Sequence, residues 1–273
     1  MFGADLSLYC VKKTIRLLPL AYLLYACPAY SQPPERWQSV DYLLASFVEI
    51  AMRSEYSPGP SPIRKWSKPI NYFFIHRVGD QALHEQLSTL HLAHLSAITG
   101  LTIQPAPNRP SANLLIVFST EDNLQKELLA DFGVQLQQQR RELFHNSVCL
   151  ASFTTASNHE IIRAIVLIPV DRARAHAKLV ECIVEELTQV LGLPNDSDKV
   201  FPSIFNDKSV NSLLTGLDQL LLKMLYDPRV KAGMTETEAM PVLRKIAREF
   251  KRDHKFETAD KDVRTDRLYE LLN

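Results

Sequence analysis

The chain has 273 residues, of which 46% are hydrophobic and 23% are charged, an ordinary composition for a globular protein with a sizeable core. Lys and Arg together number 31, as do Asp and Glu, so the formal net charge at pH 7 is zero. The chain therefore has no overall basic field to attract nucleic acid and no acidic bias toward cationic partners. We expect no nucleic acid partner.

Residues 1–31 have the features of an export signal. A positive flank precedes a short apolar run at residues 17–26, and the tripeptide Ala-Tyr-Ser that ends at Ser31 fits a cleavage site. The run is too short to span a bilayer. We predict export to the periplasm of a Gram-negative bacterium, with no membrane span after cleavage. Two alternatives are that the run is an N-terminal helix of the fold, or that Cys27 is acylated and anchors a lipoprotein to the membrane.

The cysteines fit an exported protein. Cleavage after Ser31 removes Cys10 and Cys27 and leaves Cys149 and Cys182 as an even pair in an oxidising compartment. We predict a disulfide between these two. The alternative is that they are separate buried thiols that behave as small hydrophobic residues.

The periodicity of apolar residues predicts alternating strands and helices. A first helix over residues 37–54 precedes a Pro-rich linker that ends at Pro62. The next predicted elements are strands at 70–75, 101–104 and 112–118, helices at 83–98 and 121–141, paired strands at 147–154 and 161–169, and a long helix over 171–191. This order favours an α/β (α+β) fold in which one mixed sheet is backed by helices.

Helices are also predicted after residue 192. A capping box of Thr215 and Asp218 begins one helix, another covers residues 236–252, and the charged final twenty residues are expected to be a loosely docked tail. The predicted organisation is a signal peptide (1–31), an N-terminal helix with its linker (32–62), a main domain (63–228) and a C-terminal helix with a charged tail (229–273).

The most informative stretch is residues 181–195, because it has the spacing H-E-x-x-H-x-x-G-x-x-H of a zinc-protease helix. Glu185, Gln189 and Asn195 stand where the three histidines belong. One carboxylate and two amides make a harder and weaker ligand set, better suited to Ca²⁺ or Mg²⁺, so we predict no zinc. Glu186 stands at the general-base position. Without the metal, the pKa of the attacking water stays about nine units above its value on zinc.

Three interpretations of this stretch remain open. Glu181, Glu185 and Gln189 are a solvated polar stripe, or they line a relic cleft that binds a peptide, or Glu186 performs hydrolysis. The histidines offer no recognisable metal site, and His94 is expected to be a core residue. The sequence contains no glycine-rich phosphate loop and no Gly-x-Ser-x-Gly motif, so no cofactor is predicted.

Three segments carry a resemblance to known families. Residues 185–195 resemble the H-E-L-G-H-x-L-G-L-x-H helix of matrixins, a branch of the metzincin zinc proteases. Pro202-Ser-Ile-Phe205 resembles their Ser-Ile-Met turn, and residues 214–226 resemble their last helix. More closely, ECIVEELTQVLGLPNDSD, PSIFND and LLKMLYDPRVKAGMT are similar to the bacterial family catalogued as domain of unknown function 2927 (DUF2927), which comprises exported proteins with no established activity.

The resemblance implies a zincin-like fold, in which the motif helix lies under a twisted sheet and a cleft follows the edge strand. It also assigns positions to six residues: Glu185, Gln189 and Asn195 to the relic metal ligands, Glu186 to the base, Gly192 to the tight turn and Phe205 to the floor. We therefore expect an exported, catalytically inactive metalloprotease-like domain that binds an extended peptide or envelope protein. The alternatives are a hydrolase that uses a non-zinc ion and Glu186, and a structural envelope component.

Overall fold

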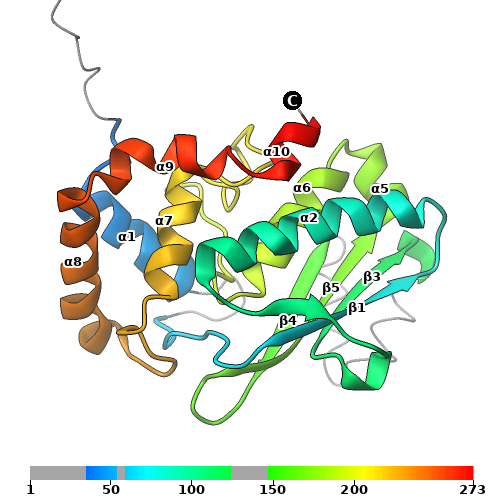
Figure 1. Cartoon of the computed structure of the whole chain (residues 1–273), viewed down its shortest axis with the longest axis horizontal. Helices are drawn as coiled ribbons and strands as arrows, with labels where there is room; N and C mark the ends of the chain where they lie inside the picture. The colour runs from blue at the N-terminus through cyan, green and yellow to red at the C-terminus, as the bar shows by residue number, and fades with distance from the viewer. Residues whose placement is uncertain (1–34, 54–58, 124–146, 273) are drawn as a thin grey trace, which may run out of the picture. The chain divides into compact units, whose positions relative to one another are not determined.

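A five-stranded mixed sheet organises the fold in the computed structural model, which describes residues 35–53, 59–123 and 147–272 (Figure 1). Its strands are β1 (Ile70–His76), β2 (Ile103–Pro105), β3 (Leu114–Ser119), β4 (Leu150–Thr155) and β5 (Ile161–Pro169). They lie in the order β2-β1-β3-β5-β4, and β4 is antiparallel to β5 whereas the other pairs are parallel. The predicted mixed sheet and the predicted hairpin of β4 and β5 are confirmed.

Helices account for most of the remaining described residues. They are α1 (Val40–Ala51), α2 (Gln81–Thr99), α5 (Val170–Ala175), α6 (Leu179–Gln189), α7 (Gly216–Leu225), α8 (Glu236–Arg252), α9 (Lys255–Val263) and α10 (Arg267–Leu272), with a 3₁₀ turn at Arg109–Ser111. The structure therefore confirms the predicted α/β class. The predicted signal segment, and most of the predicted helix over 121–141, lie outside the described residues.

The core lies mainly between the sheet and the helices. All six residues of β3 are buried, as expected for a parallel strand in the middle of a sheet. Trp37, Phe47 and Trp66 bring the N-terminal part of the chain into the same core as α6 and α7. A smaller cluster around Leu115 and Val117 lies on the other face of the sheet.

The predicted long helix over residues 171–191 is wrong, because the structure has two helices there, α5 and α6. The chain between them passes through Ala177 with a φ of 56°, which ends α5 and turns the chain before α6 begins. A non-glycine residue rarely adopts this left-handed conformation. Neither Gly nor Pro marks the position, so the sequence pattern gave no sign of the break.

The expectation of a loosely docked C-terminal tail is also wrong. The helices α9 and α10 bury Phe256, Ala259, Val263 and Leu268. The Asp260 carboxylate accepts a hydrogen bond of 2.9 Å from the backbone N–H of Gly216, the first residue of α7. The end of the chain is thus attached to α7 by a buried face and a helix-terminal hydrogen bond.

Candidate functional site

The helix α6 lies against β4 and β5 and also packs on α2. Its buried residues Cys182, Ile183, Val184 and Leu187 form the apolar face. On the α2 side, the Thr188 hydroxyl lies 3.0 Å from Nε2 of His91 and donates to the carbonyl of Val184. The motif helix is therefore placed between a sheet and a helix by its own sequence pattern.

Two histidines of α2, His91 and His94, belong to the core. Burial is the main cause that lowers the pKa of His91 to about 3, so this imidazole is neutral at physiological pH. His94 is buried, as predicted, and its Nδ1 lies 3.7 Å from a carboxylate oxygen of Asp266. Both residues join α2 to its neighbours.

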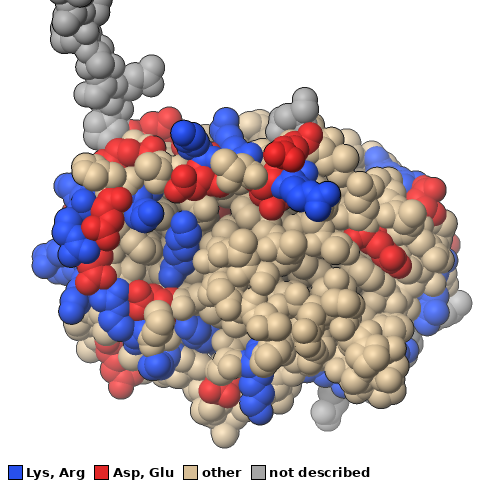
Figure 2. All heavy atoms as spheres, viewed as in Figure 1, with Lys and Arg blue, Asp and Glu red and all other residues tan. Residues whose placement is uncertain are grey.

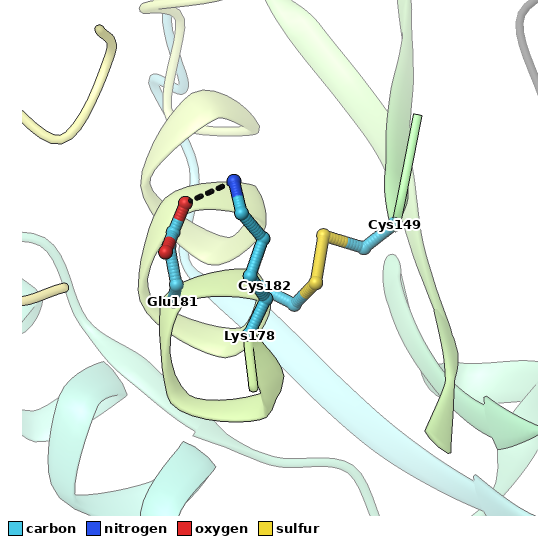
Figure 3. Close-up of a disulfide and its surroundings, with 4 residues drawn as sticks. All are labelled: Cys149, Lys178, Glu181 and Cys182. Carbon is cyan, nitrogen blue, oxygen red and sulfur yellow. Dashed lines mark hydrogen bonds and ion pairs between the residues drawn. A yellow bond between two sulfur atoms is a disulfide. The ribbon is translucent and has the colours of Figure 1, made fainter. Parts of the chain in front are cut away.

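A disulfide joins α6 to the start of the edge strand. Cys182 of α6 is bonded to Cys149, the residue before β4, with a Cα–Cα distance of 5.7 Å (Figure 3). The predicted pairing is confirmed. One turn before Cys182 along the helix, the Lys178 ammonium lies 2.8 Å from the Glu181 carboxylate, and Figure 3 shows this ion pair beside the disulfide.

Two adjacent carboxyl groups of α6 are buried. Glu185 is 9% exposed and Glu186 is 5% exposed. Burial raises the pKa of Glu185 well above its ordinary value, and the nearby carboxylates of Glu186, Glu181 and Asp207 raise it further, whereas Lys178 opposes the shift. The interpretation of a fully solvated polar stripe is therefore wrong for Glu185. The structure instead concentrates carboxyl groups on this part of α6.

The other two relic metal positions are engaged in structural hydrogen bonds. The side-chain amide of Gln189 donates to Asp196 at 2.8 Å. The side-chain amide of Asn195 donates to the backbone carbonyl of Glu49 in α1 at 2.9 Å, and its backbone N–H donates to the carbonyl of Ile50 at 3.3 Å. The turn after α6 is thus attached to α1.

These contacts test whether zinc fits the site. The amide nitrogens of Gln189 and Asn195 donate to Asp196 and to the α1 backbone. Either amide could offer a metal only its neutral carbonyl oxygen, a ligand that suits Ca²⁺ or Mg²⁺ better than zinc. Within the described residues, no group of three or more His, Cys, Asp or Glu side chains is arranged to hold a metal ion. A catalytic zinc needs three converging N, S or O ligands. The residues present do not fit zinc, and we derive no step through it.

The tight turn after α6 requires glycine. Gly192 has a φ of 111°, and a Cβ atom there would lie 2.0 Å from the carbonyl oxygen of Arg64. Two carbonyls just after the helix are also satisfied, because Trp66 Nε1 donates to the C-cap residue Val190 at 2.8 Å and the Tyr226 hydroxyl donates to Leu191 at 2.7 Å. Sequence reasoning missed these two donors, since both are distant in the chain.

Phe205 is fully buried in the turn that follows, and its carbonyl accepts from the backbone N–H of Ser197. The turn is fixed by Asp218, which accepts hydrogen bonds from the Ser203 hydroxyl at 2.6 Å and from the Ile204 N–H at 3.1 Å. Burial is the largest cause that raises the pKa of Asp218 to about 6, against the lowering effect of these donors. The predicted capping box is confirmed, but the sequence did not reveal that its aspartate also anchors this turn.

Comparison with known families shows to which family the chain belongs. A family model described as a protein of unknown function (DUF2927) matches residues 40–245. The chain belongs to the DUF2927 family. The match extends along the chain from α1 into α8. The family's shared region therefore includes helices that precede the sheet strands in the sequence and helices that follow them. Among curated proteins, none matches the chain.

Proposed function

We propose that this DUF2927 protein is an exported, zincin-like domain without zinc chemistry, and that it binds an extended peptide segment by adding it to the sheet next to β4. Its proposed location is the periplasm, and the alternative is a lipoprotein anchored to a membrane. The observation that carries the proposal is the position of β4 at the end of the sheet, tied by a disulfide to the helix that holds Glu185 and Glu186.

The arrangement of elements supports the zincin-like part of the proposal. The motif helix α6 lies against the sheet, the strand at one edge is antiparallel, and Phe205 is buried where the resemblance places a floor residue. Two of the three relic metal positions, Gln189 and Asn195, have structural hydrogen bonds, which argues for binding rather than water activation at this site.

The disulfide supports export, because such bonds persist in oxidising compartments. The sequence of residues 1–31 adds a signal of the expected composition. No helix among residues 35–53, 59–123 and 147–272 is long and apolar enough to cross a membrane. Acylation at Cys27 is the alternative mode of membrane attachment.

The edge strand has properties that suit peptide addition. Among the strands that the structure describes, only β5 pairs with β4. Five of the six residues of β4 are half-buried and Thr154 is exposed. An edge strand offers backbone N–H and C=O groups to a further strand, and side-chain pockets then add specificity. The buried carboxyl groups of α6 would favour a peptide that carries a cationic side chain.

A peptide-display selection on the purified protein tests the proposal. An enriched peptide is then measured by fluorescence anisotropy against two variants, Ala151→Pro and Ser152→Pro. Successive N–H groups of a strand point to opposite sides, so only one of these prolines removes an N–H that faces β5. The variant that keeps the wild-type melting temperature should lose peptide binding.

Two results would refute β-addition: a failure to enrich any peptide, or an enriched peptide that binds the folded proline variant as tightly as wild type. The first result would favour a structural role in the envelope. Hydrolysis of the peptide that depends on Glu186 would instead favour the hydrolase alternative. An N-methylated copy of the peptide is the matched control for backbone recognition.

A further inference from the structure

The solvent-facing side of α8 carries a continuous row of cations. We define the basic stripe as Arg244, Lys245, Arg248, Lys251 and Arg252, all of which are exposed. At 3.6 residues per turn, the five side chains fall within about 120° of the helix circumference and along about 12 Å of its axis. Figure 2 shows several Lys and Arg side chains over α8 at the left of the view, with Asp and Glu side chains among them. The neutral net charge of the chain conceals this local concentration.

The opposite side of the helix explains why the cations are aligned. Ala239, Leu243, Ile246 and Ala247 are buried. The helix α8 packs against α1, α7 and α9. The amphipathic pattern therefore fixes the orientation of α8 and leaves the stripe facing solvent.

Most of the stripe is not neutralised by the protein itself. Arg244, Arg248 and Lys251 form no ion pair with any residue that the structure describes. Arg252 pairs with Asp253 at 2.8 Å, and the Glu249 carboxylate at the border of the stripe is occupied by Arg229. Three unpaired cations on one helix face raise the free energy of the folded state through mutual repulsion, so an anionic partner would relieve a real electrostatic cost.

We propose that the basic stripe docks on the surface of an anionic phospholipid bilayer. A row of Arg and Lys on an amphipathic helix is suited to lipid head groups, because the long side chains reach the phosphates while the helix lies flat. All five side chains of the stripe are charged, so the contact is electrostatic and peripheral.

The course of the chain supports a lipid partner over nucleic acid. The Gln38 side chain donates to the carbonyl of Phe256, just beyond the end of α8, so the N-terminal segment joins the domain at that end of the stripe. The apolar run at residues 17–26 precedes Glu35 by nine residues, which span at most about 30 Å. The uncleaved segment during export, or an acyl chain on Cys27 in the lipoprotein alternative, would bring the stripe within reach of the same leaflet.

Vesicle sedimentation tests this inference on the protein as a Gram-negative host processes it, with the N-terminus determined by mass spectrometry. The vesicles contain either phosphatidylcholine alone or phosphatidylcholine with phosphatidylglycerol. The stripe variant carries Arg244→Gln, Arg248→Gln and Lys251→Gln. The control variant carries Lys261→Gln, Arg264→Gln and Arg267→Gln, which change the net charge equally at exposed positions of α9, its C-cap and α10.

The wild type and the control variant should bind the anionic vesicles, and the stripe variant should bind them about a hundredfold more weakly at low salt. Raising the ionic strength should release the wild type. Equal binding to both vesicle types, or equal losses in the two variants, would overturn the inference. Binding to a DNA duplex that the stripe variant loses, without binding to vesicles, would overturn the lipid assignment.

Discussion

Removal of the disulfide should destabilise the fold by an amount that follows from the length of the loop it closes. Cys149 and Cys182 are 33 positions apart in the sequence. For a loop of this length, the chain-entropy model gives a stabilisation of roughly 4 kcal/mol, because the crosslink restricts the unfolded chain. In a domain of this size, that change should lower the melting temperature by about 8–16 °C.

The assay compares urea unfolding of three samples by circular dichroism: oxidised wild type, wild type with a reductant, and the double variant Cys149→Ala/Cys182→Ala. The reduced wild type isolates the crosslink, because its sulfur atoms still fill the core. The double variant should lose about 1 kcal/mol more, since Cys182 is fully buried and alanine leaves a small cavity.

Two outcomes would refute this reasoning. Equal urea midpoints for the oxidised and reduced wild type would mean that the bond does not form or that the unfolded loop is already restricted. An effect of the reductant on the double variant, which has no such bond to lose, would show that the reductant acts elsewhere.

Three further predictions concern the relic motif. Gly192→Ala should destabilise the fold by roughly 2–4 kcal/mol, because the new Cβ would meet the carbonyl of Arg64 at 2.0 Å in a left-handed backbone; unchanged thermal stability would contradict this close approach. Glu185→Gln should stabilise the fold at neutral pH, because a folded-state pKa raised by burial makes wild-type stability fall as pH rises above the ordinary value of 4.5. The two proteins should differ least below pH 4.5, and a gap that instead grew as the pH fell would reverse the sign. Histidines at 185 and 189 should bind zinc as well alone as with Asn195→His, because residue 195 faces α1; a tenfold gain from the third histidine, measured by competition with a chelator, would show that it reaches the metal.

Local signals predicted most of the secondary structure. The dense β-branched and aromatic run at β1 and the alternating strands of the hairpin gave the correct elements. The predicted capping box at Thr215 coincides with the start of α7, because a side chain three residues away decides it. The structure has a second capping box, at Thr235, at the start of α8. The disulfide followed from the count of cysteines that remain after the predicted cleavage.

Features that depend on distant contacts were not predictable. The break at Ala177 has no sequence marker, and the docking of α9 depends on the space beside Gly216, where a Cβ would lie 2.7 Å from the backbone N of Asp260. The burial of Glu185 was missed for a similar reason. Helical periodicity places this residue on a polar face, but only the packed structure shows that the face is covered.

The relic metal positions differ in their contacts: Asn195 has a structural use, whereas the Glu185 carboxyl has no hydrogen bond to a described residue. Asn195 attaches the turn to α1, and the Ser197 hydroxyl adds a second tie by donating to the Glu49 carboxylate at 2.8 Å. Asn195 therefore has a structural use in the fold. Glu185 is different, because its carboxyl is buried and accepts no hydrogen bond from a described residue, and neighbouring carboxylates raise its pKa. A buried ionisable group that costs stability and accepts no hydrogen bond from the described residues is a candidate for contact with a ligand. The position of Glu185 one helical turn from Cys182, on the helix tied to the edge strand, therefore supports the proposed binding of a peptide that carries a cationic side chain.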